Sequence, residues 1–365
     1  MKAIFNIFLV LLSGNLYAEN CSGWFKKNGQ QIKLKYAKMF TVYTYKKNYL
    51  INVADQNYLL SHNSASFNLC APTLRVNIPV KRVVALSTTY IPAIALLHEE
   101  KSLVGFSNIK YISSASIDKK QLIEVQYPPN PELVLSTKAD LVVAYVATSA
   151  KLEGVERLLQ LKIPVVLNAD FLEKHPLARA EWFKFFGFFY NKEKAANKIF
   201  NEIEREFDSI KSNVKKNVSR RPLVLVGKND NGIWRGPSAQ SDFIKLLTLA
   251  GADYFFPKKN KVAESIESVL KNLNKIDFWL PQNSWYNLNQ LLAHDQRYKN
   301  FPFVMAKNVY NSTNKVTRNG GNDYWESAFM RPDLLLKDLV KIFHPHLLPH
   351  HELQWFKKLD YAKSK

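Results

Sequence analysis

Hydroxyl, aromatic and guanidinium side chains gather in segments that follow short apolar runs of this chain. They are Thr88, Thr89, Tyr90, Tyr111 and Tyr145 in the first half and Trp234, Arg235, Trp285, Arg318 and Trp325 in the second. Aromatic rings offer a flat apolar surface with a polar edge, and arginine forms charge-assisted contacts with carboxylate or catecholate oxygens. The combination predicts binding of a flat anionic ligand. Each of the three tryptophans has the alternative role of a packing anchor, because aromatic residues dominate cores as well as sites.

The motifs of common cofactor-dependent and hydrolytic enzymes are missing from the sequence. No Gly-x-Gly-x-x-Gly follows an apolar run, no glycine-rich loop ends in Lys-Ser or Lys-Thr, and no Gly-x-Ser-x-Gly occurs. A hydrolase acting through Asp170 and Glu326 stays an alternative, although nothing pairs these two carboxylates in the sequence. We therefore expect a binding protein without a cofactor and not an enzyme.

Four of the eight histidines, His344, His346, His350 and His351, stand close together near the end of the chain. Imidazole is a common metal ligand, so a metal site has to be considered. Pro345 and Pro349 break the helix that would present these rings on one face, and no cysteine or carboxylate cluster accompanies them. We expect surface or packing histidines and no metal site.

The composition is that of a folded globular protein with an anionic partner. Of the 365 residues 47% are hydrophobic and 13% aromatic, which excludes a mostly disordered chain. At roughly 100–200 residues per domain, the length suggests two domains. The 51 Lys and Arg against 31 Asp and Glu give a net charge of +20, and a chain this basic attracts nucleic acid, a membrane surface or a small anion.

Residues 1–18 have the pattern of a secretory signal peptide: one cation, a short apolar run, and small residues before a plausible cleavage point. Export argues against nucleic acid as the partner and favours a small anion, lipid or membrane complex. In an oxidising compartment, the only two cysteines, Cys21 and Cys70, are expected to form a disulfide. The alternative of a lipidated Cys21 fits less well, because Glu19 and Asn20 stand where such a site uses small residues.

The elements that must position these residues follow from hydrophobic periodicity. Residues 19–78 alternate apolar and polar side chains over 33–36, 40–45, 49–53 and 58–60, which predicts a small antiparallel β extension. Apolar runs at 82–86, 102–106, 139–145 and 163–167 then alternate with helical segments near 91 and at 155–161. Buried strands alternating with helices predict a parallel sheet covered on both faces, in a first α/β lobe of residues 79–186.

The segment 191–214 contains neither Gly nor Pro and repeats its apolar residues at helical spacing. It predicts one long helix, within a linker of residues 187–216, that joins two α/β lobes. A second lobe of residues 217–343 follows, with strands expected at 223–227, 276–280 and 308–310 and helices at 241–250, 266–273 and 334–343. Residues 344–365 are expected to form a C-terminal tail. A cleft between two such lobes is the usual place for a ligand.

Taken in order, several segments of the two lobes resemble the periplasmic substrate-binding proteins of ATP-binding-cassette (ABC) importers for iron siderophores, haem and cobalamin. They are RVVAL at 82–86, NPELVL at 130–135, ADLVV at 139–143, IPVV at 163–166, LLTLAGA at 246–252, SIESVL at 265–270 and RPDL at 331–334. The resemblance runs from about residue 81 to residue 343, so the β extension is additional to it.

The resemblance implies a periplasmic protein that captures a ligand between its lobes and delivers it to a permease dimer in the inner membrane. Together with the net charge, it favours an anionic iron-siderophore complex bound by Arg235 and Arg318, with haem, bound through Tyr111 or Tyr145, and cobalamin as alternatives. It also implies that Glu132 and Glu267, which stand at matching positions of the two lobes, contact the permease. An acidic residue near a helix start is favoured by the helix dipole as well.

Overall fold

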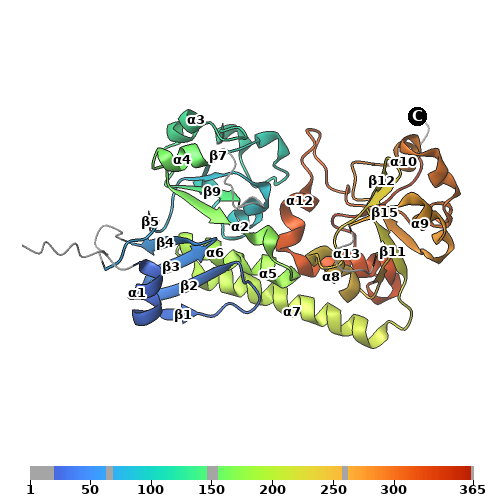
Figure 1. Ribbon diagram of the computed structural model, residues 1–365, viewed down its shortest axis with the longest axis horizontal. Coiled ribbons are helices and arrows are strands. Elements are labelled where there is room, and N and C mark those ends of the chain that lie inside the picture. The colour runs from blue at the N-terminus through green and yellow to red at the C-terminus, as the bar shows by residue number, and fades with distance from the viewer. Residues whose placement is uncertain (1–19, 63–68, 146–154, 257–261, 363–365) are drawn as a thin grey trace, which may run out of the picture.

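The computed structural model describes residues 20–62, 69–145, 155–256 and 262–362. It shows two α/β lobes joined by one long helix, α7 (Glu193–Asn217), with a sheet from the start of the chain on the flank of the first lobe (Figure 1). The expected fold class is confirmed. The expected signal peptide, residues 1–18, lies outside the described residues.

The N-terminal sheet is mostly antiparallel and differs from the expectation at both ends. It follows helix α1 (Cys21–Asn28) and has the order β1 (Gln30–Ile32), β2 (Phe40–Tyr45), β3 (Asn48–Val53), β4 (Gln56–Ser61) and β5 (Leu74–Asn77). Strand β5 runs parallel to β4, because the connection between them is long enough to return the chain to the start of β4. The strand expected at 33–36 is absent, since the backbone N–H groups of Lys35, Tyr36 and Ala37 donate to the buried Glu181 carboxylate instead.

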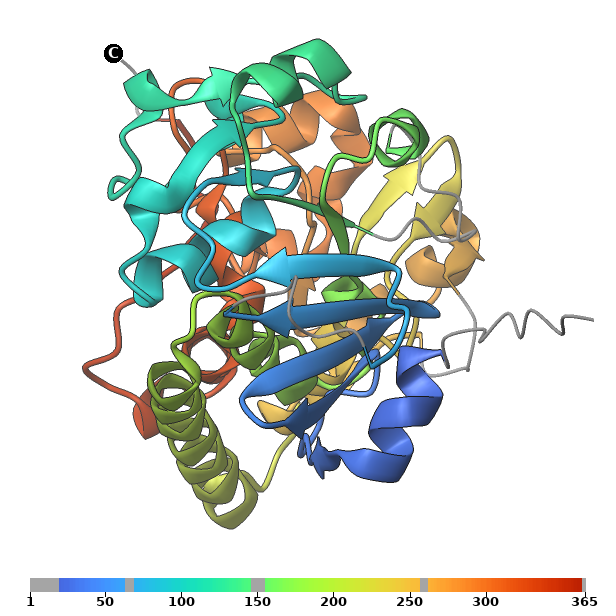
Figure 2. The ribbon, with the colours of Figure 1, turned by 90° about the vertical axis from the view of Figure 1, so that its left-hand side faces the viewer.

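Each face of this sheet covers a different core. One face packs on the first lobe, and the other holds a small cluster of Cys21, Phe25, Leu50, Leu59 and Cys70 beneath α1. In the view of Figure 2, the strands lie below the first lobe, with α1 and α7 on opposite sides. The expected disulfide is confirmed, because Cys21 and Cys70 are bonded with their Cα atoms 4.8 Å apart. The Cys21 sulfur is therefore not free for a lipid.

The first lobe is built on a parallel sheet of five strands in the order β10-β9-β6-β7-β8. Its strands are β6 (Val83–Ala85), β7 (Leu103–Phe106), β8 (Ile123–Glu124), β9 (Leu141–Tyr145) and β10 (Val165–Asn168). Its helices are η2 (Thr88–Tyr90), α2 (Ile91–Leu96), η3 (Glu100–Ser102), η4 (Ile109–Tyr111), η5 (Lys119–Gln121), α3 (Pro131–Ser136), α4 (Glu156–Gln160) and η6 (Asp170–Leu172). The parallel strands and the helices near 91 and 155–161 are confirmed.

Three consecutive helices connect the lobes: α5 (Pro176–Glu181), the aromatic-rich α6 (Phe183–Phe189) and α7. Helix α7 buries Phe200, Ile203 and Phe207 on one face and exposes its charged residues, as its periodicity predicts. It packs against α6 on the first-lobe side and α13 (Pro332–Phe343) on the second-lobe side. A single helix thus spans the base of both lobes (Figure 1).

The second lobe combines two small sheets with many short helices. The strands β11 (Leu223–Val226), β14 (Asp253–Tyr254) and β16 (Phe278–Leu280) form a parallel sheet, and β12 (Lys228–Asp230), β13 (Ile233–Arg235) and β15 (Ala263–Ser265) form an antiparallel one. The helices are α8 (Asp242–Leu249), α9 (Ile266–Leu270), η7 (Leu273–Lys275), α10 (Leu288–His294), η8 (Gln296–Asn300), α11 (Pro302–Met305), α12 (Asp323–Ser327), η9 (Ala328–Met330), α13 and η10 (Pro345–Leu347).

The segment expected as a tail is an integral part of the second lobe. Strand β17 (Tyr310–Asn311) pairs with β18 (Lys357–Lys358), and Trp355, Phe356 and Leu359 are buried. The Asp338 carboxylate accepts hydrogen bonds from the backbone N–H groups of Gln354 and Trp355, which fixes the segment on α13. The boundary expected at residue 343 therefore does not separate two parts of the structure.

Two of the clustered histidines have partners within the protein. His344 Nε2 lies 3.1 Å from the carbonyl oxygen of Gly251, and His351 Nε2 lies 2.8 Å from Asp338 Oδ1. In the part of the chain that the structure describes, no group of three or more His, Cys, Asp and Glu is arranged to hold a metal ion. The same residues include no helix that is long and apolar enough to span a membrane.

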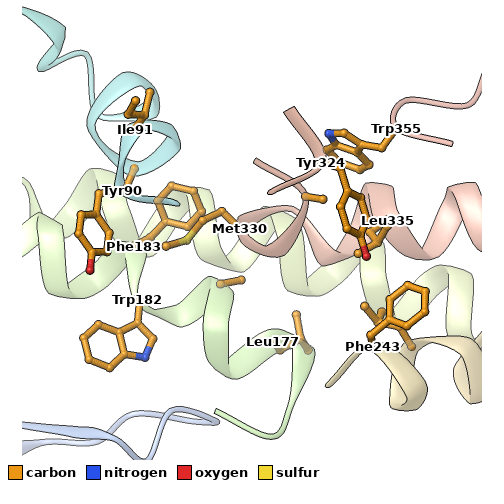
Figure 3. Close-up of a cluster of buried hydrophobic side chains, with 14 of the residues drawn as sticks. Tyr90, Ile91, Leu177, Trp182, Phe183, Phe243, Tyr324, Met330, Leu335 and Trp355 are labelled. Carbon is orange, nitrogen blue, oxygen red and sulfur yellow. The ribbon is translucent and has the colours of Figure 1, made fainter. Parts of the chain in front are cut away.

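One hydrophobic core runs from the first lobe into the second without interruption. At the junction, Tyr90 and Ile91 of the first lobe lie near Phe183 of α6, and Met330 of the second lobe points toward the same ring (Figure 3). Helix α12 contacts both η2 and α2 across this junction. The lobes are therefore joined by packed side chains as well as by α7.

Candidate functional site

A groove of about 280 Å³ lies between the lobes. Its lining combines hydroxyl, amide and aromatic groups from both lobes. These residues are Leu86, Ser87, Thr88, Phe106, Ser107, Asn108, Tyr111, Gly320, Asn322 and Trp325. None of these lining residues is charged, so the groove itself offers hydrogen bonds and ring faces to a ligand.

The first-lobe wall of the groove consists of the segments that leave β6 and β7. These strands are parallel neighbours, so their carboxyl ends meet at one edge of the sheet, where open α/β sheets bind ligands. Ser87 caps η2 by accepting a hydrogen bond from the backbone N–H of Thr89, and the two hydroxyls lie 2.9 Å apart. Thr88 and Tyr111 line the groove, and the Tyr111 side chain lies beneath the ammonium group of Lys110.

The second-lobe wall is a loop and helix that we call the interlobe arm, residues 316–327. Its loop is closed by the backbone hydrogen bonds from Thr317 N–H to Gly321 and from Gly320 N–H to Thr317. Asn322 then caps α12 by accepting a hydrogen bond from Tyr324 N–H. Trp325, on the first turn of α12, is half exposed and lines the groove. Figure 1 shows the arm between the two lobes, with its loop projecting above α12.

The two walls are bound to each other next to the ring of Trp325. The buried Glu326 carboxylate accepts one hydrogen bond from Ser113 N–H to Oε2, at 2.6 Å, and one from Ser114 N–H to Oε1, at 2.9 Å. Burial raises the pKa of Glu326 to about 7, although the two N–H groups act in the opposite direction. At Gly321 the backbones come so close that a Cβ would stand 2.6 Å from the Tyr111 carbonyl oxygen.

A second polar contact joins the lobes outside the groove lining. The guanidinium of Arg179, on α5, lies 3.4 Å from Asp170 of the first lobe and 3.1 Å from Asp242 at the start of α8. Its Cζ atom is 4.0 Å from the centre of the Phe329 ring. Burial raises the pKa of Asp170 and Arg179 opposes that rise. Asp170 and Glu326, the carboxylates of the hydrolase alternative, are thus both engaged in contacts between the lobes.

The structure brings together three of the ten predicted ligand-binding residues, Thr88, Tyr111 and Trp325. It places three others in the core, which corrects the expectation that they face a ligand. Tyr90 is fully buried at the lobe junction (Figure 3). Trp234 is fully buried and donates its indole N–H to the carbonyl oxygen of Val226 at 3.0 Å. Trp285 packs against the ring of Trp279. For Trp234 and Trp285 the alternative role of packing anchor therefore applies.

The four remaining candidates lie outside the lining of the groove. The Thr89 hydroxyl contacts Ser87, and the Tyr145 hydroxyl is hydrogen-bonded to that of Tyr127. Arg235 is exposed on β13 and lies 3.4 Å from Asp230. Arg318 is exposed in the loop of the interlobe arm, close in sequence to the lining residue Gly320.

The ten predicted ligand-binding residues do not include the lining residues Phe106, Ser107, Asn108, Leu86, Ser87, Gly320 and Asn322. For the first three a signal was present, because they end or follow an apolar run that was correctly predicted as a strand. For the arm, the signal was the Gly-Gly-Asn sequence before α12, which is typical of a tight loop followed by a helix cap.

Glu132 and Glu267 occupy equivalent places in the two lobes. Each is exposed in the first turn of a short helix, α3 or α9. Asn130 caps α3 and Ser265 caps α9, so the same local design recurs. The role of the two carboxylates in docking stays a prediction.

The sequence has relatives among known proteins, and the fold matches solved solute-binding proteins. An uncharacterized lipoprotein of Methanocaldococcus jannaschii is 24% identical over 305 residues, which cover 78% of this chain and 70% of that protein. A possible iron-binding (periplasmic solute-binding) protein of Staphylococcus epidermidis has the same fold, with a TM-score of 0.56 and 18% identity over 72% of this chain and 98% of that one. A periplasmic heme binding protein of Pseudomonas aeruginosa superposes with a TM-score of 0.53 and 17% identity, over 73% of this chain and 93% of that one.

The family model for periplasmic binding proteins matches residues 83–316. The match covers more than half of the chain and begins where the N-terminal sheet ends, so this sheet is an addition to the family fold. Members of the family are binding proteins of transporters and not enzymes. The chain therefore belongs to the periplasmic binding protein family.

Proposed function

We propose that this protein is the solute-binding component of an ABC importer and captures an iron-siderophore complex in the groove between its lobes. The observation that carries the proposal is the groove lining, in which Tyr111 and Trp325 bring aromatic groups from the two lobes and Thr88 and Asn108 add polar groups. Aromatic side chains with polar partners suit a flat, oxygen-rich chelate. No step of the proposal requires a chemical reaction.

The charge distribution favours an anionic ligand through long-range attraction and not through charged residues in the groove lining. Because the lining residues are uncharged, the attraction comes from the net charge of +20 and from cations near the groove, such as Lys110 and Arg318. Such a field raises the rate of encounter with an anion more than it strengthens the bound state. The groove volume of about 280 Å³ is near the lower end for ligand sites, so part of a siderophore would remain in contact with solvent.

Haem and cobalamin are the alternative ligands, and titration distinguishes the three. We expect ferric catecholate or carboxylate siderophores to quench the fluorescence of Trp325, whose ring is half exposed in the groove. The variant Trp325→Phe identifies the part of the quenching that arises there, because Trp234 and Trp279 are fully buried and fluoresce in both proteins. Binding of haem or cobalamin alone would exclude the siderophore assignment.

Delivery to a permease dimer is proposed to use Glu132 and Glu267. Exposed ion pairs contribute only about 0–1 kcal/mol each, but two contacts on separate lobes also fix the orientation of docking. The double variant Glu132→Lys/Glu267→Lys should abolish uptake through the cognate importer and leave ligand affinity in solution unchanged. Normal transport by this variant, or loss of its ligand binding, would contradict the docking role.

Export by residues 1–18 is part of the same proposal, because a solute-binding component must meet its ligand outside the inner membrane. N-terminal sequencing of protein secreted by the native host should find a chain that begins near residue 19. A mature chain that still carries residues 1–18 would rule out cleavage of a signal peptide.

A further inference from the structure

Around Tyr111 and Trp325, the two walls of the groove are formed by separate segments of the chain. The first-lobe wall ends in the segment around Tyr111 to Ser114, and the second-lobe wall is the interlobe arm. The distance between Tyr111 and Trp325 therefore depends on the packing of α12 against η2 and α2 and on the contacts that join these two segments. Among the described residues, two such contacts lie directly beside the groove: the Glu326 carboxylate on the Ser113 and Ser114 N–H groups, and Gly321 against the Tyr111 backbone.

The geometry of the Glu326 contact is that of a two-point clasp. Each carboxylate oxygen accepts one backbone N–H, from consecutive residues of the other lobe. At pH values above the pKa of Glu326, which is about 7, the carboxylate is ionised, and such charge-assisted hydrogen bonds are about twice as strong as neutral ones. Glu326 follows Trp325 directly in α12, and Ser113 lies two residues after Tyr111. The clasp therefore holds the parts of the chain that carry both aromatic walls.

We propose that Glu326 is a positioning residue that sets the width of the ligand groove by clasping the interlobe arm to the first lobe. The assignment of the groove as the ligand site rests on the proposed function, whereas the clasp itself does not. Glu326 is not among the lining residues, so it acts on a ligand through Trp325 and Tyr111. Gly321 has the complementary role, because only a residue without a Cβ allows the arm to approach Tyr111 this closely.

The clasp is tested first without any ligand, by site-resolved amide hydrogen exchange. In Glu326→Ala the N–H groups of Ser113 and Ser114 lose their acceptors, and we expect them to exchange at least about tenfold faster than in the wild type. Trp325 should at the same time become more accessible to acrylamide. Glu326→Gln retains one acceptor oxygen and should give an intermediate result. Glu352→Gln, a matched change of an exposed carboxylate, should change neither measurement.

A second, independent variant changes the contact between Gly321 and the Tyr111 backbone. Gly321→Ala introduces a methyl group 2.6 Å from the Tyr111 carbonyl oxygen, so it should widen the groove and increase acrylamide quenching of Trp325 without changing Glu326. This variant keeps the test decisive if Glu326→Ala does not fold. Unchanged exchange at Ser113 and Ser114 in a folded Glu326→Ala or Glu326→Gln protein would overturn the proposal.

Affinity for ferric siderophores gives the second readout. We expect Glu326→Ala and Gly321→Ala to weaken binding of the ferric catecholate probe at least about tenfold, with an intermediate loss in Glu326→Gln and none in Glu352→Gln. Faster amide exchange with unchanged affinity would show that the clasp does not position the site and would overturn its role. If the wild type binds none of the probes, the proposed ligand is wrong, while exchange at Ser113 and Ser114 and accessibility of Trp325 still decide whether the clasp exists.

Discussion

Two groups of aromatic residues in the second lobe look alike in sequence and have opposite roles in the structure. Trp234, Trp279 and Trp285 form one group with Tyr298, and the rings of neighbouring members lie about 5–6 Å apart at varied angles. Trp325 belongs to the other group and contacts Tyr324 edge-on at 4.9 Å. Trp234 and Trp279 are 0% exposed, whereas Trp325 is 50% exposed.

The difference between the groups lies in where each indole N–H finds an acceptor. Trp234 and Trp279 donate to the carbonyl oxygens of Val226 and Gly227, at the end of β11, at 3.0 and 2.8 Å. Burying an indole N–H without a hydrogen-bond partner costs free energy, and these two acceptors avoid that cost. In the interlobe arm the fully buried ring is that of Tyr324, which leaves the Trp325 ring at the groove. An aromatic residue in a loop can therefore contact a ligand only when its ring is not already packed in the core.

The largest expected effect is a loss of stability when a side chain of the buried tryptophan group is truncated. Trp234→Ala removes a fully buried ring and leaves a cavity, which typically costs about 3–5 kcal/mol of unfolding free energy. Urea denaturation measures this loss. Trp325→Ala, the matched change in the other group, should cost less than Trp234→Ala because half of its ring is already in water. Equal losses in the two variants would remove the distinction between the groups.

Ligand affinity should show the reverse order. Trp325→Ala should weaken binding of the ferric siderophore about 3- to 10-fold, which corresponds to an aromatic contact of about 0.5–1.5 kcal/mol. Trp325→Phe, which keeps a ring, should recover part of this loss. Isothermal titration calorimetry measures both variants, and unchanged affinity in Trp325→Ala would remove this residue from the site.

The pH dependence of stability should distinguish Glu326, which follows Trp325 in the interlobe arm, from the buried group of Trp234, Trp279 and Trp285. Its pKa in the folded protein is raised to about 7 by burial and by Asp323, against the opposing effects of the Ser113 and Ser114 N–H groups and Lys119. A group whose folded pKa lies above its unfolded value stabilises the fold most below the unfolded pKa, and this stabilisation is lost as pH rises through the folded pKa.

We therefore expect the stability of the wild type relative to Glu326→Gln to be highest below about pH 4.5 and to fall until the pH exceeds about 7. Urea denaturation of both proteins at a series of pH values measures the difference, and other titrating groups such as Asp170 cancel in it. Trp234→Phe, compared with the wild type in the same way, should show no such dependence. A difference that rises with pH would contradict the burial of this carboxyl.

The smallest effects on ligand binding are expected for the two predicted arginines. Arg235 follows Trp234, and Arg318 lies in the loop of the interlobe arm. Arg318→Ala should slow association with an anionic chelate and weaken binding by no more than about fivefold, the range of exposed charges. Arg235→Ala should leave affinity unchanged, because this side chain lies outside the groove lining and near Asp230. Stopped-flow fluorescence measures both, and a larger effect of Arg235→Ala would place the ligand on β13.

Local patterns were sufficient for most of the elements that carry the site. The apolar runs of β6, β7, β9 and β10 and the amphipathic α7 were predicted within a few residues, because burial on two faces or on one helical stripe leaves a period in the sequence. The strand expected at 33–36 failed for a non-local reason. Its backbone N–H groups are taken by Glu181, a residue from α5. Periodicity contains no information about such a partner.

By itself, the sequence determined the two-lobe α/β architecture, the long helix between the lobes and the pairing of Cys21 with Cys70. It also determined that polar and aromatic side chains follow the strands, since strand ends are visible in the hydrophobic pattern. Only the tertiary structure decided which of these side chains meet. Thr88, Tyr111 and Trp325 face one groove because the interlobe arm crosses to the first lobe and Glu326 binds Ser113 and Ser114 there. Contacts between residues more than 200 positions apart are set by the packing of whole elements, which no local pattern records.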